Sequence, residues 1–337
     1  MKIEHQRSRR MKRVKYFLIC LSALLFFLAG CGKDQQFTPP GSSQSIAVIS
    51  QLKKASFSIV DLQKNKIVSS VDLKHPLTDL VHINKDVIIA SSKEGQSLIE
   101  INLKKGTATD YMDVNKGLTS LAYDADTNTL LVTDSEKNVV YFIDTVHKKI
   151  KATVKTGTLP SSMALSSSGT LFVLNAKSHS VSVIDIEKKK KIRTISVLER
   201  PSGIYFDGHS IWVGGHGKPG TLNKSIFAYD PKTGKKQREI KLGVMPVAFF
   251  SEKNSSTLYV LCHGDHTLYK VNTEKNKLLS SVETGQNPNY ITADSSSIYV
   301  SNLDDNSVSV IDKHTFMLKN RLNIPAGPYA IMLEEKK

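Results

Sequence analysis

A regularly spaced Asp or Asn residue divides this chain into seven segments of 40 to 45 residues. Each of these residues ends a short apolar run and begins a polar turn. A proline or glycine marks a second position in every segment with the same spacing. The first set is Asp61, Asn102, Asp144, Asp185, Asp230, Asn272 and Asp312, and the second is Pro76, Gly117, Pro160, Pro201, Pro246, Pro288 and Pro328. Seven repeats of this length predict a β-propeller.

Each repeat contains four short segments that are apolar or alternate between apolar and polar residues. Clusters of Gly, Asn, Asp and Ser separate them, most clearly between residues 290–293, 297–302, 307–312 and 316–323. Such segments predict one four-stranded antiparallel sheet per repeat. The expected fold class is therefore all-β, a seven-bladed β-propeller of four-stranded antiparallel blades. We name the strands of a blade A to D from the axis outward.

The first repeat lacks its strand A. The chain enters at residues 46–50, which align with a strand B, and residues 329–333 follow the last periodic proline as a strand A would. We expect this C-terminal strand A to pair with the N-terminal strands B–D and close the ring, because an open ring would expose two unpaired edges. The propeller is expected to span residues 45–334.

The best repeat combines residues 298–302, Ile-Tyr-Val-Ser-Asn, with Ser307–Asp312 and a Gly-x-x-Pro turn at 285–288. The fourth repeat has equivalent segments at 171–175 and 180–185. These motifs resemble the YVTN-type propeller family, and the resemblance covers residues 45–334. It implies a fold much more than a function, because propellers include both binding scaffolds and enzymes.

The N-terminus carries an export signal. Five basic residues, Arg9, Arg10, Lys12, Arg13 and Lys15, precede an uncharged apolar stretch over residues 16–28. This order is typical of a secretory signal. The stretch is shorter than the roughly 20 residues that a membrane-spanning helix needs. The sequence predicts a signal peptide over residues 1–30, starting at Met1 or Met11.

The end of this signal, Leu28-Ala29-Gly30-Cys31, resembles the lipobox of bacterial lipoproteins. The resemblance implies cleavage before Cys31 and attachment of diacylglycerol, with acyl chains such as palmitate, to its thiol. Residues 31–44, rich in Gln, Ser, Pro and Gly, are then expected to form a flexible tether. The protein is expected to be lipid-anchored at the bacterial cell membrane, on the extracytoplasmic side.

The cysteine content agrees with this assignment. Cys20 leaves with the signal peptide and Cys31 is lipidated, so Cys262 has no partner for an internal disulfide. Cys262 is expected to be a buried strand residue. No Cys-x-x-Cys-His segment is present, which excludes a covalently attached c-type haem.

The chain has a formal charge of +15, and the part that follows residue 30 keeps 39 basic against 30 acidic side chains, or +9. Much of the excess lies in the C–D turns, at Lys64, Lys66, Lys104, Lys105, Lys148, Lys149, Lys188 to Lys191, Lys232, Lys235, Lys236, Lys275, Lys277 and Lys313. These lysines either prevent edge-to-edge pairing and maintain solubility or bind anionic lipid head groups or wall polymers. Nucleic acid is a poor partner, because an aromatic-interleaved basic groove is absent.

Four candidate metal ligands fall in the B–C loops of the fifth and sixth repeats. They are His216, His263, Asp265 and His266. Imidazole and carboxylate groups suit zinc or another first-row metal. No tight spacing fixes the four residues relative to one another, and His and Asp are ordinary loop residues.

The sequence favours a non-catalytic binding or scaffold module for an envelope partner, either a protein or a cell-envelope polymer. No cofactor is expected beyond a possible divalent metal. The alternative is a metal-assisted, lactonase-like hydrolase working at the four candidate ligands, and a third possibility is a chaperone-like assembly factor. No Gly-x-Ser-x-Gly motif is present for a serine hydrolase. A monomer is expected, because a closed propeller leaves no open sheet edge.

Overall fold

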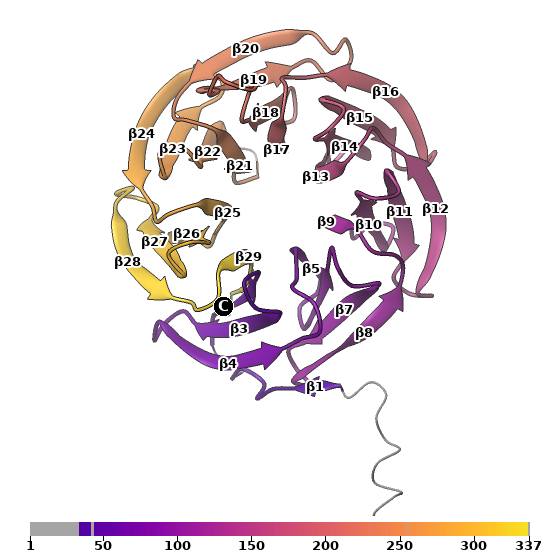
Figure 1. Ribbon diagram of the computed structural model, residues 1–337, viewed down its shortest axis with the longest axis vertical. Coiled ribbons are helices and arrows are strands. Elements are labelled where there is room, and N and C mark those ends of the chain that lie inside the picture. The colour runs from indigo at the N-terminus through magenta and orange to yellow at the C-terminus, as the bar shows by residue number, and fades with distance from the viewer. Residues whose placement is uncertain (1–33, 42–43, 254, 336–337) are drawn as a thin grey trace, which may run out of the picture. The chain divides into compact units, whose positions relative to one another are not determined.

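Each sequence repeat folds into an antiparallel sheet, and the seven sheets stand around a common axis (Figure 1). The structure is a computed structural model that describes residues 34–41, 44–253 and 255–335. All regular secondary structure of these residues consists of β-strands. The innermost strand of each blade lies next to the axis, and the outermost strand forms the outer wall of the ring (Figure 1). The predicted all-β, seven-bladed propeller is confirmed.

The strands of each blade follow, from the axis outward. Blade 1 has β29 (Pro328–Glu334), β2 (Ile46–Gln51), β3 (Ser56–Asp61) and β4 (Lys66–Asp72); blade 2 has β5 (Asp79–Asn84), β6 (Val87–Ser91), β7 (Ser97–Asn102) and β8 (Thr107–Asp113); blade 3 has β9 (Leu118–Asp124), β10 (Thr129–Asp134), β11 (Val139–Asp144) and β12 (Lys149–Lys155). Blade 4 has β13 (Pro160–Leu165), β14 (Thr170–Asn175), β15 (Ser180–Asp185) and β16 (Lys190–Ser196); blade 5 has β17 (Pro201–Phe206), β18 (Ile211–Gly215), β19 (Ser225–Tyr229) and β20 (Lys236–Lys241). Blade 6 has β21 (Pro246–Phe250), β22 (Thr257–Cys262), β23 (Thr267–Asn272) and β24 (Lys277–Glu283); blade 7 has β25 (Pro288–Ala293), β26 (Ser297–Asn302), β27 (Ser307–Asp312) and β28 (Leu318–Asn323).

The last strand closes the ring as the sequence predicts. β29 pairs antiparallel with β2, in a register that places Ile46 opposite Glu334. The backbone N–H of Ala330 also donates to Ser50 Oγ at 3.0 Å. Blade 1 therefore combines one C-terminal strand with three N-terminal strands, and β2 presents no free edge for association.

The periodic Asp and Asn side chains fold the turns between strands C and D. Asp61 Oδ1 accepts hydrogen bonds from the backbone N–H groups of Gln63 and Lys64, at 3.0 and 2.9 Å. The other six periodic residues make the same kind of bond in their own turns. Asp and Asn favour such turns because their short side chains reach the backbone two or three residues ahead. The spacing seen in the sequence is therefore the spacing of these turns.

A buried asparagine ends strand B in the two blades that best match the YVTN pattern. Asn302 Oδ1 accepts from Gly285 N at 3.0 Å, and its Nδ2 donates to Ser307 Oγ and Ser309 Oγ at 3.0 and 2.9 Å. Asn175 makes the equivalent bonds in blade 4. A Cβ atom at Gly285 would lie 2.7 Å from the Asn302 side chain, which explains the glycine of the Gly-x-x-Pro turn. The asparagine thus fastens the D–A loop to its blade.

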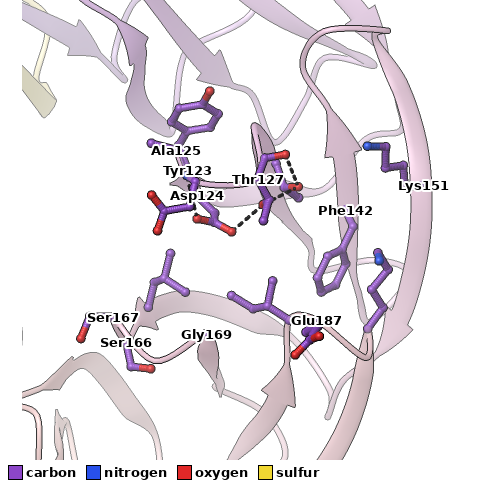
Figure 2. A pocket seen from close by; sticks show the side chains of 15 residues that line it. Tyr123, Asp124, Ala125, Thr127, Phe142, Lys151, Ser166, Ser167, Gly169 and Glu187 are labelled. Atoms are coloured by element: carbon purple, nitrogen blue, oxygen red, sulfur yellow. Dashed lines mark hydrogen bonds between the residues drawn. The ribbon is translucent and has the colours of Figure 1, made fainter.

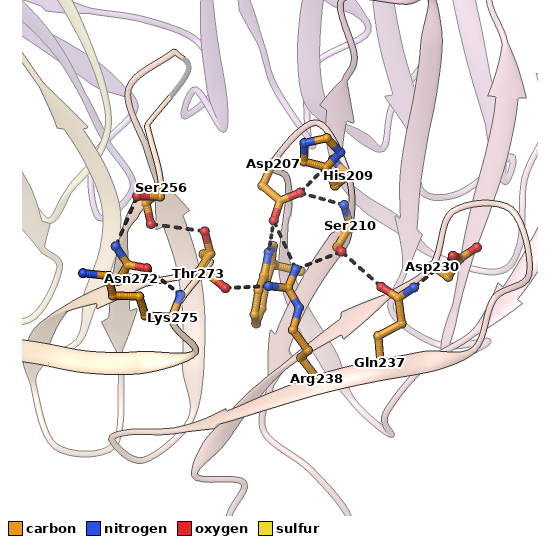
Figure 3. Close-up of polar contacts among 11 residues, drawn as sticks. Asp207, His209, Ser210, Asp230, Gln237, Arg238, Ser256, Asn272, Thr273 and Lys275 are labelled. Carbon is orange, nitrogen blue, oxygen red and sulfur yellow. Dashed lines mark hydrogen bonds and ion pairs between the residues drawn. The ribbon is translucent and has the colours of Figure 1, made fainter.

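Apolar side chains of neighbouring blades pack against each other to form the core, and polar bridges reinforce the outer wall. Trp212 is fully buried between blades 5 and 6. Its Nε1 donates to Asp207 Oδ2 at 2.7 Å, and the Arg238 guanidinium lies 5.0 Å from its ring. Arg238 also donates to the Thr273 carbonyl of blade 6 at 2.5 Å (Figure 3). One arginine therefore links a buried aromatic side chain to the next blade.

A short segment that precedes the propeller packs against it. β1 (Gln35–Gln36) pairs antiparallel with β8, and Phe37 N donates to Gly106 O at 2.8 Å. The Phe37 side chain is 9% exposed and meets the Phe57 ring edge-on at 5.8 Å. The sequence predicts a flexible tether over residues 31–44, and this prediction does not hold at residues 35–37, which we call the N-terminal clasp. The sequence does not predict the clasp, because two strand residues and one aromatic residue are too few to show the alternating pattern of a strand.

The expected signal peptide over residues 1–30 and the expected lipidation site, Cys31, lie outside the described residues. No helix formed by the described part of the chain is long and apolar enough to cross a membrane. Cys262 ends β22 and is fully buried, as expected from the sequence.

We expect Asn302→Ala to destabilise the propeller by about 2–4 kcal/mol, because it leaves the buried Gly285 N–H and two serine hydroxyls without their partner. The matched control is Asn323→Ala, since Asn323 is exposed at the end of β28. Urea unfolding of both variants measures the difference. An Asn302→Ala midpoint equal to that of the control would contradict the role assigned to this amide.

Candidate functional site

The four candidate metal ligands lie on loops at the same end of blades 5 and 6. His216 directly follows β18, whereas His263, Asp265 and His266 lie between β22 and β23. Backbone hydrogen bonds hold both loops to the D–A loops beside them, from His216 N to Arg200 O and from His263 N to Met245 O, each at 3.0 Å. We call the surface formed by the B–C and D–A loops the B–C face.

The structure brings two of the candidates together. The His216 and His263 rings are 5.9 Å apart between centroids, and both side chains are half-buried. His263 Nε2 lies 3.1 Å from Asn289 Oδ1, so the amide oxygen keeps the hydrogen on this nitrogen. Burial, followed by the nearby His216 ring, lowers the pKa of His263 to about 4. Burial and the Arg200 charge also lower the pKa of His216, so both imidazoles are neutral at pH 7.

The Asp265 carboxylate binds groups of its own blade and of the D–A loop that leads into this blade. Its Oδ2 accepts hydrogen bonds from Tyr269 Oη at 2.7 Å and from Val244 N at 3.1 Å. The carboxylate therefore holds a strand and a D–A loop together, and burial and this contact raise the pKa of Tyr269. Asp265 Oδ1 is buried without a hydrogen-bond partner in the described structure.

The main-chain atoms of His266 stabilise the turn in which it lies. It has a positive φ of 52°, and its carbonyl accepts from Thr284 N and Thr284 Oγ1, both at 2.8 Å. Its side chain is exposed. Among the described residues, no group of three or more His, Cys, Asp or Glu side chains is arranged to hold a metal ion. The structure thus assembles a histidine pair rather than a four-residue cluster.

The B–C loop of blade 5 projects from this face on a fixed base. Asn223 N donates to His216 O at 3.0 Å, and Asn223 Nδ2 donates to the carbonyls of Gly215 and Ser225 at 3.0 and 2.7 Å. Beyond this base, residues 218–222 are exposed, and the Leu222 side chain is 61% exposed. The sequence analysis singled out the histidine of this loop but not its leucine.

A carboxylate near the axis was also missed by the sequence analysis. Asp79 on β5 accepts from Leu80 N at 2.9 Å and, in the neighbouring blade, from Leu121 N at 2.8 Å and Ser120 Oγ at 3.2 Å. Burial raises its pKa to about 6 despite these bonds. Because the bonds from Leu121 and Ser120 join blade 2 to blade 3, Asp79 fastens two blades together.

A groove of about 780 Å³ opens at the opposite end of the ring, between blades 3 and 4. Figure 2 shows Tyr123 and Asp124 on one wall and Ser166, Ser167 and Gly169 on the other. Lys151, Lys189, Asp126 and Glu187 also line it. Because the groove combines apolar surface with charges of both signs, its chemistry does not select one ligand class.

No protein-family model matches the chain, and no curated protein sequence matches it. Solved structures do match its fold. A functionally unknown protein from Desulfotomaculum acetoxidans has a TM-score of 0.72 at 13% identity, covering 87% of this chain and 99% of that one. Hydrazine synthase from Kuenenia stuttgartiensis has a TM-score of 0.64 at 16% identity, with 75% and 88% covered. Apo AztD from Citrobacter koseri has a TM-score of 0.61 at 13% identity, with 88% and 99% covered. Likeness at these identities shows the propeller fold alone.

We expect the stability of the protein to fall between pH 6.5 and pH 4 because of His263. Its folded pKa of about 4 lies below the ordinary histidine value of 6.5, so the unfolded chain takes up the proton first as the pH falls. The stability that neutral His263 contributes is complete above pH 6.5 and declines by up to about 3 kcal/mol near pH 4.

Urea unfolding at pH 7, 5.5 and 4 measures this loss. His263→Asn should reduce it, whereas His314→Asn, a change at an exposed C–D turn residue, should leave it as in the parent protein. Equal acid sensitivity in His263→Asn and the parent protein would show that His263 is not the responsible group.

Proposed function

We propose that this protein is a lipid-anchored, extracytoplasmic binding module that holds an envelope partner on its B–C face and catalyses no reaction on it. The export signal and the lipobox ending in Cys31 support the location. The observation that carries the binding role is the B–C loop of blade 5, which presents the exposed Leu222 on a hydrogen-bonded base.

A loop of this kind suits recognition of a partner. Its base is fixed by Asn223, so less conformational freedom is lost when a partner binds. An exposed leucine beside this fixed base gains most when it is buried in an apolar pocket. This favours a protein partner over a cell-envelope polymer, because a hydrated polymer offers few such pockets.

The polar side chains of the B–C face support binding rather than turnover. The carboxylates of Asp265 and Asp305 accept backbone hydrogen bonds, and Asp304 forms an ion pair with Lys53 at 3.1 Å. His263 is held by Asn289. A general base must be free to reach a substrate proton, and these groups are committed to the loops themselves.

The histidine pair is the one observation that favours a second candidate, a metal-assisted hydrolase. Two neutral imidazoles with centroids 5.9 Å apart can act together as metal ligands. Asp265 would have to leave Tyr269 and Val244 to complete the site. Stoichiometric zinc in the parent protein that is lost in His216→Ala would move this candidate ahead of the binding module.

We expect Cys31→Ser to release the protein from membranes, because the thiol that carries the acyl chains is lost and a diacyl anchor is needed for stable attachment. Detergent phase separation and metabolic labelling with palmitate measure this in a bacterial host. Retention of Cys31→Ser in the detergent phase, with the label still incorporated, would contradict lipidation at this residue.

We expect Leu222→Asp to weaken partner binding about 30-fold, which corresponds to the loss of one interface hot spot of about 2 kcal/mol. The matched control is Leu279→Asp, which changes an exposed leucine on the outermost strand of blade 6. Crosslinking on intact cells, followed by affinity measurement with the captured partner, compares the two. Equal losses in both variants, or none in Leu222→Asp, would place the binding surface elsewhere.

A further inference from the structure

Apolar side chains lie between lysines at one end of the outer wall. Most of the exposed large apolar side chains of the described residues lie in C–D turns or in the first residues of the outermost strands. In blades 1 to 3 these are Ile67, Val68, Val146 and Ile150, of which Val68 is 42% and Val146 68% exposed. Exposed apolar groups among lysines are typical of surfaces that contact a membrane interface.

The lysines of the same sector are free to bind anions. Lys66, Lys104, Lys105 and Lys149 are exposed, and no ion pair joins them to an acidic group within the described residues. In blade 2 the periodic turn residue is Asn102, so no turn carboxylate offsets Lys104 and Lys105. We call these four lysines and the four apolar residues the lysine sector.

The N-terminal clasp joins the chain to the propeller inside this sector. Gln36 pairs with Thr107, the first residue of β8 after the C–D turn, and Gln35 pairs with Ala108. The turn is shaped for the clasp, because Gly106 has a φ of 67° and a Cβ there would lie 2.2 Å from the Phe37 carbonyl oxygen. The C–D turn of blade 2 therefore has a conformation that accommodates the clasp.

The clasp shortens the distance over which a lipid anchor could act. Cys31 precedes Gln35 by four residues, so their Cα atoms can be at most about 14 Å apart. A free tether over residues 31–44 would reach several times further. An acylated Cys31 would therefore keep the outer wall of blade 2 close to the bilayer.

We propose that the lysine sector docks onto the anionic head groups of the membrane to which the protein is anchored, and that the B–C face is thereby held away from the bilayer for its partner. The inference rests on the lipid anchor of the proposed function. Lysines near an anionic surface attract it, and Val68 and Val146 can insert between head groups. An anionic wall polymer would engage the lysines but would leave these apolar side chains in water.

The test uses the full chain purified from the membranes of a bacterial host that processes lipoproteins. It is reconstituted in phosphatidylcholine vesicles with and without phosphatidylglycerol and with spin-labelled quencher lipids. Single cysteines are introduced by Val146→Cys in the sector and Leu222→Cys on the B–C face, and each is labelled with an environment-sensitive fluorophore. Cys262 is fully buried and burial raises the pKa of its thiol, so it stays unlabelled at pH 7. We expect quenching at position 146 on anionic vesicles, and none at position 222.

A second variant tests the charges. Combining Lys66→Gln, Lys105→Gln and Lys149→Gln should lower the ratio of docked to undocked protein on the order of 100-fold, so that the quenching at position 146 disappears. The matched control combines Lys232→Gln, Lys235→Gln and Lys277→Gln, which neutralise lysines of blades 5 and 6, and should leave the quenching intact.

The outcomes separate this inference from the anchor on which it rests. Failure of the protein to float with vesicles means that Cys31 carries no anchor and overturns both proposals. Flotation with equal quenching at positions 146 and 222, or with none at 146, overturns docking of the sector and leaves the anchor standing. Binding of soluble dextran sulfate by the parent protein but not by the triple lysine variant, with no quenching at position 146 on anionic vesicles, would identify the sector as a polyanion site and would also overturn the inference.

Discussion

The fold depends on the closure of the ring by β29. A blade of four short strands cannot cover its own two faces, so its apolar side chains are buried only against the blades on either side. Blade 1 obtains its inner strand from the other end of the chain, and Ala330 and Ile331 on that strand are almost completely buried. Without it, blades 1, 2 and 7 would expose their cores, and every loop position that depends on the ring geometry would be lost.

In the closed ring the C–D turns form one surface and the B–C loops form another, and the two sets of loops are stabilised differently. A periodic Asp or Asn folds every C–D turn, and five of the seven turns have the same length, so their outward side chains are the main difference between them. Lysines and a few apolar residues occupy these outward positions. The B–C loops have four residues in five of the blades, but their side chains differ, and the loop of blade 5, residues 216–224, is longer and carries the exposed Leu222. The repeated C–D turns suit a uniform charged surface, whereas the extended B–C loop of blade 5 suits contact with a specific partner.

The sequence predicted the blades because each repeated feature has a local physical cause. Asp61 and its equivalents form their turns from neighbouring atoms, and strand alternation is a local pattern as well. Their positions in the B–C loops of consecutive repeats also placed His216 and His263 on adjacent blades, and the structure brings their rings together. It could not place Asp265, whose direction is set by the Tyr269 hydroxyl across the hairpin. The N-terminal clasp was missed for a similar reason, because Phe37 is buried by a distant blade.

The B–C face obtains its rigidity from strained residues in the D–A loops. Leu159, Arg200 and Met245 precede the periodic prolines with φ values of 60°, 49° and 57°, a region that residues other than glycine seldom occupy. In each case the carbonyl of the strained residue accepts the N–H of the residue that begins the adjacent B–C loop. The strain, on the order of 1 kcal/mol at each position, is offset by a bond that fastens two loops together. Because the same bond recurs around the ring, the loop bases form a fixed frame. Differences between the loops are therefore confined to the residues between these bases, such as the exposed residues 218–222 of blade 5, where a partner would be selected.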